Sequence, residues 1–457
     1  MDRGSDTGIM RIPRADASTR KNEIRWFAIS MFGIVVLKLG FALFLLPGLK
    51  DEINPQYSIG NVDNYYSLAK SINHGIGYRF TPDTTLTLMR EPGYPYLLAA
   101  LMHEFDDYKR AAVVVNILLT SLSALLVFNL TRSLSPLQWA PVIAALVYVL
   151  HPGVIVTELR SGVEVPFTFL SLIFLILLRK AVCTESTSAY VKAGIALGVT
   201  TYVRSTALLF PVFLIFHVLF FHRDWRSILL SASRAVLVIS CALLVLSPWI
   251  IRNYGLVGKF VPTASVQGIA MQVGNYQCTH ADGKKEFVDL DKEAAVVRNK
   301  LATEQGYRFK GDYYQFFYDP HDEVQFNEFV GAQVVHQYLQ SPAVFVKCAS
   351  ENVFNFWFQG KNRSATMINM VIQSVYLILA IAGTVLGFRQ MHKPTLWLLL
   401  LFVAYTMAVY APIHAQARYS IPIMPILSIL ASIAICEVVV RTFRRDGVSE
   451  EPRPVPR

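Results

Sequence analysis

Residues 26–46 read WFAISMFGIVVLKLGFALFLL, an apolar run with one charged side chain, Lys38. A helix of about 20 apolar residues crosses a hydrocarbon core about 30 Å thick, and this run is long enough. Its basic leader is long, and no cleavage pattern of small residues separates it from a soluble domain. The run therefore predicts an uncleaved membrane anchor rather than a signal peptide.

Similar runs recur along the whole chain. Of its 457 residues 53% are hydrophobic and only 16% are charged, which is not the composition of a soluble globular protein. We expect an all-α integral membrane protein with about ten transmembrane helices, within a range of about 9 to 12. The runs lie at 26–46, 110–130, 137–151, 164–180, 190–203, 205–221, 230–250, 367–388, 395–412 and 419–440. The third and fifth are short and could be tilted or re-entrant.

Basic residues set the orientation. The N-terminal tail carries six Lys or Arg residues, which places it in the cytoplasm. With ten spans every cytoplasmic turn is basic, and the C-terminus is cytoplasmic as well. The net charge of +10 then follows from topology, and no nucleic-acid partner is required. We expect a multi-pass protein of a bacterial inner membrane whose active site faces the periplasm.

Two outer segments are too long to be simple turns. The predicted parts are a basic tail (1–25), an N-terminal transmembrane catalytic module (26–250) with an outer loop (47–109), an outer cap segment (251–366), C-terminal transmembrane helices (367–440) and a second tail (441–457). The outer loop predicts a short helix at 63–74 and another opened by EPGYP at 91–95, since proline is tolerated in a first helical turn.

Periodic polarity in the cap segment predicts surface helices at 286–305 and 321–340. The stretch FVKCASENVFNFWF (345–358) predicts a helix along the membrane interface. Cys278 and Cys348 both fall on the outer side, where a disulfide can form, but the sequence leaves their pairing open. The other three cysteines fall at or within spans and predict packing roles.

Ionisable residues at span edges are candidate functional groups because a membrane makes them costly. Asp63 lies in NVDNYYSLAK (61–70), and Glu164 lies in HPGVIVTELRSGVEVPF (151–167). The topology places both on the outer face. Either could instead serve as a helix N-terminal acid that complements the macrodipole. Glu158, in the same stretch as Glu164, is expected to be solvated.

Three arginines on the same face need an explanation, since positive charge is disfavoured there. They are Arg204, Arg252 and Arg418. A lipid phosphate would explain them, because guanidinium offers two parallel hydrogen bonds and keeps its charge when desolvated; the alternative is snorkelling to lipid headgroups. Lys38 is expected to pair with one of the acids or to reach outward.

Several other chemistries lack their motifs. The sequence contains no HExxH, P-loop, GxSxG or dinucleotide-binding glycine motif. Two histidines, His151 and His414, flank outer helix ends, where capping or packing is the expected role. No cofactor and no metal site are predicted.

The order of several stretches resembles the polytopic type C glycosyltransferases. More narrowly, it resembles the branch of protein mannosyltransferases, lipid A aminoarabinose transferases and galacturonosyltransferase-like enzymes. The stretches are VDNYYSLAKSI (62–72), REPGYPYLL (90–98), HPG with SGVEVPF (151–167), YVRST (202–206), SPWIIRNYG with FVP (247–262) and ARYSIPIMP (417–425). The resemblance implies transfer of a sugar from a polyprenyl monophosphate to a glycolipid, glycan or protein acceptor on the outer face.

The resemblance also implies site residues. Asp63 corresponds to the acid of the first outer loop and Glu164 to a second acid before the fourth span. Many relatives have Asp-Glu where this chain has Asp63–Asn64, so Asp63 must work alone or with Glu164. With one donor phosphate a divalent metal is less necessary than for a nucleotide diphosphate donor, and metal-independent, inverting transfer is expected. The further candidates for acceptor contact or support are Tyr65, Tyr66, Arg90, Lys38 and Tyr419.

Two other functions use the same features. A transporter or flippase of a lipid-linked sugar would also grip a phosphate with arginines, but inverted repeats and paired broken spans are not found. In a non-catalytic scaffold, the outward acids and arginines would be coincidental.

Overall fold

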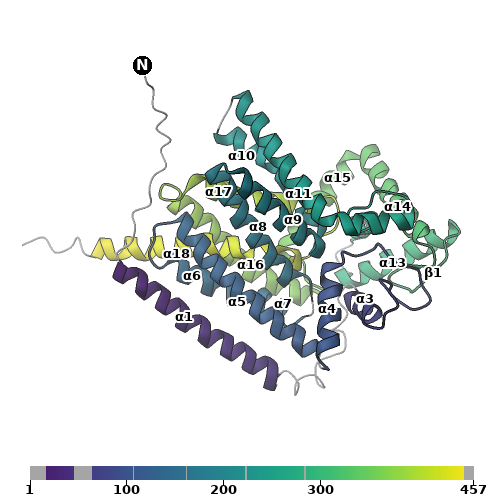
Figure 1. Cartoon of the computed structure of the whole chain (residues 1–457), viewed down its shortest axis with the longest axis horizontal. Helices are drawn as coiled ribbons and strands as arrows, with labels where there is room; N and C mark the ends of the chain where they lie inside the picture. Colours follow the sequence, from purple (N-terminus) through teal and green to yellow (C-terminus); the bar gives the residue numbers. More distant parts are fainter. Residues whose placement is uncertain are drawn as a thin grey trace, which may run out of the picture.

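The computed structural model describes residues 17–45, 64–106, 108–160, 162–221, 224–281 and 285–446. Within these residues the fold is almost entirely helical. Two short strands, β1 (Phe309–Lys310) and β2 (Phe316–Phe317), form an antiparallel pair. The long helices run side by side, and the shorter helices of the outer segments gather at one end of them (Figure 1). The predicted all-α membrane fold is confirmed.

Seven described helices are long and apolar enough to cross a membrane. They are α1 (Ala17–Gly40) with η1 (Phe41–Leu45), α5 (Tyr108–Leu134), α8 (Glu164–Thr184), α11 (Trp225–Val257), α16 (Arg363–Gly387), α17 (Lys393–Tyr410), and η6 (Ala417–Ile423) with α18 (Met424–Asp446).

An eighth span exists if α6 (Ala140–Val149) and α7 (Pro152–Glu158) are counted as one, with a bend of 54° between them. Pro152 cannot continue the preceding helix and pushes His151 into an extended conformation. His151 then caps the new helix, since its Nδ1 accepts from Val154 N at 3.3 Å. The expected irregularity of the third apolar run is confirmed, and so is the capping role of His151.

Ten spans were expected, and the described residues contain seven or eight. The fifth run forms α9 (Thr187–Val203), whose 17 residues extend about 26 Å, short of the hydrocarbon thickness. The sixth is broken into η4 (Ser205–Ala207), η5 (Phe210–Phe213) and α10 (Leu214–Phe221). Apolar composition marked both runs, but composition alone does not show where a helix is interrupted.

The short helix α9 packs between α8 and α11. Glycines allow the close approach to α11. A β-carbon on Gly194 would lie 2.5 Å from that of Cys241, and one on Gly198 would lie 2.6 Å from that of Val245. Small residues at such contacts are how membrane helices maximise packing.

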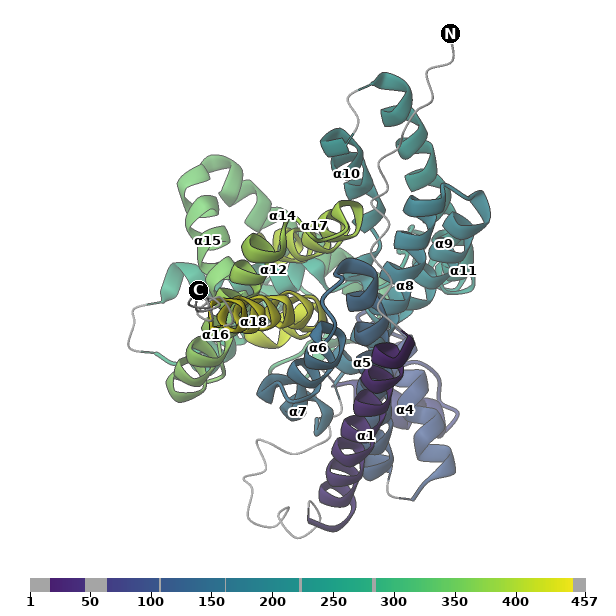
Figure 2. The same ribbon diagram turned by 90° about the vertical axis from the view of Figure 1, so that its left-hand side faces the viewer.

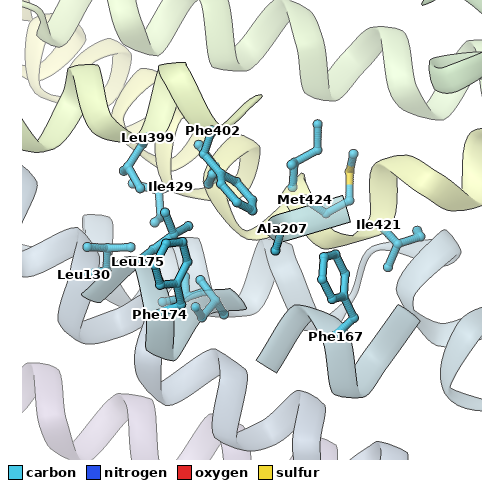
Figure 3. Close-up of a cluster of buried hydrophobic side chains, with 14 of the residues drawn as sticks. Leu130, Phe167, Phe174, Leu175, Ala207, Leu399, Phe402, Ile421, Met424 and Ile429 are labelled. Atoms are coloured by element: carbon cyan, nitrogen blue, oxygen red, sulfur yellow. The ribbon is translucent and has the colours of Figure 1, made fainter. Parts of the chain in front are cut away.

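The most deeply buried span is α18, which lies beside α5, α6 and α16 (Figure 2). The core between α8, α17 and α18 is aromatic and aliphatic. Figure 3 shows Phe174 and Leu175 of α8 near Phe402 of α17 and Ile429 of α18, all of them buried. This core fixes the relative positions of the helices whose ends carry the site described below.

The outer segments form short helices. They are α3 (Tyr65–Asn73) and α4 (Gly93–Glu104) before α5, and α12 (Gln267–His280), α13 (Phe287–Glu304), α14 (Pro320–Gln340) and α15 (Pro342–Phe358) between α11 and α16. The helices predicted at 286–305 and 321–340 are confirmed as α13 and α14. A disulfide between Cys278 and Cys348 joins α12 to α15.

Lys38 and Glu158 form a buried ion pair. Lys38 Nζ lies 2.8 Å from Glu158 Oε2 and also donates to Val149 O at 2.8 Å, so it ties α1 to α6 and α7. The expectation that Glu158 is solvated was wrong, because its side chain is 2% exposed. The cation that compensates it comes from a distant span, a pairing that one sequence does not reveal.

Replacing Lys38 with Met should strongly destabilise the protein. It would leave the Glu158 carboxylate buried without its cation, at a cost of about 3–5 kcal/mol. Thermal unfolding of the purified protein in detergent measures this loss. Adding Glu158→Leu should recover much of the stability, because the pair is then replaced by apolar groups.

The matched control is Lys285→Met, which breaks an exposed pair with Glu293 of similar length and should change the unfolding temperature little. Equal effects of the Lys38 and Lys285 substitutions would contradict the assignment of a structural role to the buried pair.

Candidate active site

The ends of three helical segments meet around one carboxylate. Glu164 is the first residue of α8 and is 3% exposed. Its Oε1 lies 3.6 Å from Arg418 Nη1 in η6 and 4.0 Å from Arg204 Nη1, which directly follows α9. Within the described residues, two guanidinium groups face this one carboxylate. We call Glu164, Arg204 and Arg418 the Glu164 cluster.

Two tyrosine rings form a wall beside the cluster. Tyr410, at the end of α17, stacks on Tyr419 with ring centroids 4.7 Å apart. Arg204 Cζ lies 4.6 Å from the Tyr419 centroid and 5.4 Å from that of Tyr410, and Arg418 Cζ lies 5.1 Å from that of Tyr419. Cation–π contacts of this kind hold guanidinium planes while excluding water.

Arg204 stays charged in this environment. Burial lowers its pKa, but Tyr410, Tyr419, Glu164 and Tyr65 outweigh that effect and raise the pKa above its ordinary value. A residue of the first outer loop also reaches this region, because Glu91 Oε1 accepts from the N–H of Ser205, the residue after Arg204. The site therefore combines groups from the first outer loop, the middle of the chain and its C-terminal spans.

The backbone after Arg204 is held from two sides. Glu91 Oε1 accepts from Ser205 N at 2.9 Å, and Thr206 O accepts from Tyr405 OH at 2.6 Å. Glu91 is buried, and its role was not predicted. It lies within the REPGYP stretch that carried the family resemblance, but nothing in one sequence shows that its partner is 114 residues away.

Tyr78 fixes the residues around Glu91. Its hydroxyl is 3.1 Å from Arg90 O and 3.0 Å from Glu91 O, so it donates to this pair of carbonyls. Burial, followed by the nearby Tyr65 and Glu91, raises the pKa of Tyr78 well above its ordinary value. Tyr78 therefore remains a donor at any physiological pH.

Gly162 lies directly beneath the Glu164 carboxylate. A β-carbon on Gly162 would overlap Glu164 Oε2, so any other residue there would require the carboxylate to move. Among the residues that the structure describes, no group donates a hydrogen bond to the buried Oε1 of Glu164. That oxygen can accept a hydrogen bond from a bound hydroxyl.

The predicted catalytic residue Asp63 lies outside the described residues. The residue after it, Asn64, adopts a left-handed conformation (φ 62°) and precedes α3, which asparagine tolerates better than most residues. Tyr65 is buried with its ring edge-on to Tyr94, and Tyr66 is half-buried. Arg90 Cζ lies 6.0 Å from the Tyr65 ring centroid, so these candidates gather near the start of α3.

Arg252 does not join the Glu164 cluster in the interactions that the described residues show. Its Nη1 donates to Thr87 O at 2.9 Å and to Asn253 Oδ1 at 2.8 Å, and its guanidinium lies 4.4 Å from the Trp249 ring centroid. It lines a cavity of about 350 Å³ together with Tyr96 and Tyr202. The sequence placed the three arginines at one depth of the membrane, but not at one position around the helix bundle.

Lys38 pairs with Glu158 instead of with a residue of the Glu164 cluster. His414 has a packing and hydrogen-bonding role, since its Nδ1 is 2.9 Å from Gln277 Oε1 in α12. In the described ranges no group of three or more His, Cys, Asp or Glu is placed to hold a metal ion. Metal independence stays a prediction.

Comparisons with known proteins agree with the fold. Residues 89–251 match the family model of the dolichyl-phosphate-mannose-protein mannosyltransferases. The archaeal oligosaccharyltransferase AglB from Archaeoglobus fulgidus, solved with an inhibitory peptide and a dolichol-phosphate, is similar with a TM-score of 0.52 and 13% identity over 96% of this chain and 53% of that chain. The apo form of the Archaeoglobus fulgidus oligosaccharyltransferase is similar with a TM-score of 0.52 and 16% identity over 93% of this chain and 52% of that chain.

A further similar structure is ArnT from Cupriavidus metallidurans bound to undecaprenyl phosphate, with a TM-score of 0.39 and 11% identity over 92% of this chain and 79% of that chain. A search of curated protein sequences gives no significant match. The chain spans about half the length of the oligosaccharyltransferases it resembles, and these identities establish the fold alone. The predicted resemblance is confirmed: the chain has the fold of the type C glycosyltransferases, and residues 89–251 match the mannosyltransferase family within them.

Proposed function

We propose that the chain is a membrane glycosyltransferase that moves a sugar from a polyprenyl monophosphate to an acceptor hydroxyl on the outer face, with inversion. The observation that carries this proposal is the Glu164 cluster, a buried carboxylate between two arginines at the outer ends of α8, α9 and η6. Its two guanidinium groups suit the donor phosphate, a diester that becomes a monoester as the sugar leaves, and its position at the helix ends suits a substrate anchored in the outer leaflet.

The arginines would act on the leaving group. As the bond between the anomeric carbon and the phosphate oxygen breaks, the electron pair leaves on the phosphate, and Arg204 and Arg418 stabilise the developing charge. Guanidinium can hold two phosphate oxygens at once. The tyrosine wall lowers the local dielectric and strengthens these interactions.

Asp63 would act as the general base. It would take the proton of the acceptor hydroxyl as that oxygen attacks the anomeric carbon from the face opposite the phosphate, which inverts the centre. Glu164 would orient a sugar or acceptor hydroxyl through the carboxylate oxygen that has no donor in the described residues. Tyr65, Tyr66, Arg90 and Tyr419 would line the acceptor side of the site.

The acceptor would be a glycolipid, a glycan or a protein, selected by the cap segment 251–366. The similar archaeal enzyme was solved with a peptide and a dolichol-phosphate, which supports a lipid phosphate as the donor carrier here. Transport of a lipid-linked sugar fits less well, because transporter sites lie near the bilayer midplane, whereas the Glu164 cluster lies at helix ends.

Replacing Asp63 with Asn should abolish sugar transfer while leaving the protein inserted and folded, because asparagine cannot take the acceptor proton. Transfer of radiolabelled sugar from a polyprenyl-phosphate donor, with thermal unfolding as the folding control, measures this. Asn64→Asp is the neighbouring control and should retain activity. Full activity in the Asp63 variant would contradict the assigned base.

Replacing Arg418 with Ala should raise the KM for the donor more than the KM for the acceptor, because the lost guanidinium faces the donor phosphate. Steady-state kinetics with each substrate varied in turn separates the two. Arg308→Ala removes an exposed outer-face arginine of the cap segment and is the matched control. An unchanged donor KM in the Arg418 variant would argue against phosphate binding at the cluster.

Chelation should not reduce turnover, because the cations proposed to stabilise the leaving phosphate belong to the protein. The assay compares initial rates before and after extended dialysis against EDTA. A large loss of rate that manganese or magnesium restores would overturn the metal-independent mechanism.

A further inference from the structure

A buried carboxylate outside the Glu164 cluster joins the cap segment to the first outer loop. Glu323, in the first turn of α14, is 1% exposed. Its Oε2 accepts from Thr87 Oγ1 at 2.6 Å, and its Oε1 accepts from Leu88 N at 2.7 Å and from Ser265 Oγ at 2.9 Å. We call Glu323, Thr87, Leu88 and Ser265 the Glu323 clamp.

The clamp holds residues 87–89 from several directions. Leu88 O accepts from Ser265 N at 2.8 Å, Thr87 Oγ1 accepts from Met89 N at 3.0 Å, and Thr87 O accepts from Arg252 Nη1 at 2.9 Å. Residues 87–89 and Ser265 are buried, so each lost partner would leave one of their polar atoms without water or protein to bind it. The clamp therefore fixes the position of the backbone just before Arg90.

A short path leads from the clamp to the Glu164 cluster. Residue 89 is followed by Arg90 and Glu91, whose carbonyls accept from Tyr78. Glu91 then accepts from the backbone N–H of Ser205, the residue after Arg204. Arg204 in turn faces Glu164. Each step is a hydrogen bond, an ion pair or a peptide bond between neighbouring residues.

We infer that Glu323 is a positioning residue: by clamping residues 87–89, the cap segment sets the position of Arg204 beside Glu164. Glu323 itself touches neither Arg204 nor Glu164 in the described contacts. The kinetic consequence rests on the proposed function, whereas the structural coupling does not. The cap segment would thus help to build the site as well as cover it.

The carboxylate suits this role chemically. Burial raises the pKa of Glu323, opposed by the hydrogen bonds from Thr87, Leu88 and Ser265 and by the charge of Arg252. A carboxylate with three donors can be mimicked in part by an amide, because the oxygen of glutamine still accepts and its NH₂ can donate to Thr87 Oγ1. Alanine offers neither.

The first test compares Glu323→Ala with Glu323→Gln. The alanine variant should lower kcat by about 10²-fold through misplacement of Arg204, with a smaller change in donor KM. The glutamine variant should recover most of this loss. Glu328→Ala, which removes an exposed acid paired with Lys259 on the same helix, should leave kcat unchanged.

A double-mutant cycle separates positioning from general destabilisation. If Glu323 and Glu91 act along one path, Glu323→Ala combined with Glu91→Gln should lose no more activity than the more damaging single change. Independent effects would multiply. Where Glu323→Ala fails to fold, Thr87→Val and Ser265→Ala each remove one donor and take its place in the cycle.

The second test does not depend on catalysis. In a chain whose free cysteines, Cys183, Cys241 and Cys436, are replaced by serine, Ser205→Cys should react faster with a membrane-impermeant maleimide when Glu323→Ala is added, but not when Glu328→Ala is added. If neither the unaltered chain nor any variant transfers sugar, but Glu323→Ala still speeds maleimide labelling of the Ser205→Cys chain, the proposed function fails and the positioning role stands. Multiplicative losses, a glutamine variant no better than alanine, or an unchanged labelling rate would overturn the positioning role.

Discussion

The Glu164 carboxylate, buried at the N-terminal end of α8, is the constraint around which this end of the helix bundle is arranged. A carboxylate at that depth costs several kcal/mol unless cations compensate it. Arg204 and Arg418 supply that charge at 4.0 Å and 3.6 Å, and neither lies in a regular α-helix. One follows the end of α9 and the other lies in a 3₁₀ segment before α18, so interrupted helices bring both guanidinium groups to the same carboxylate.

The same constraint is met differently at two other buried acids. Glu158 has one cation, Lys38, and the pair is neutral. Glu323 has three hydrogen-bond donors and holds two outer segments together. Of these three sites, the Glu164 cluster is the one where the described residues set two guanidinium groups beside one carboxylate. This difference is why the cluster, rather than the other buried carboxylates, is proposed to receive an anionic substrate.

The sequence predicted well where residues lie along the spans, but it predicted poorly where they lie around the helix bundle. Apolar runs fixed which residues lie at the outer ends of spans, so Glu164, Arg204 and Arg418 could be selected. Hydropathy contains no information about rotation around the bundle, so Arg252 was grouped with them although it contacts the loop at Thr87. Glu91 and Glu323 were missed because their partners are distant in sequence: Ser205 is 114 residues from Glu91, and Thr87 is 236 residues from Glu323. The broken sixth run was missed for a related reason, since composition does not locate a helix interruption.

Binding of a polyprenyl phosphate is the most direct test of the central claim that the Glu164 cluster is a phosphate site. Native mass spectrometry of the purified protein would compare polyprenyl phosphate with the uncharged polyprenol, in the unaltered chain and in an Arg204→Gln, Arg418→Gln double variant. The account predicts that the unaltered chain retains the phosphate and not the alcohol, and that the double variant retains neither. Equal retention of the two lipids, or undiminished phosphate binding by the double variant, would contradict it.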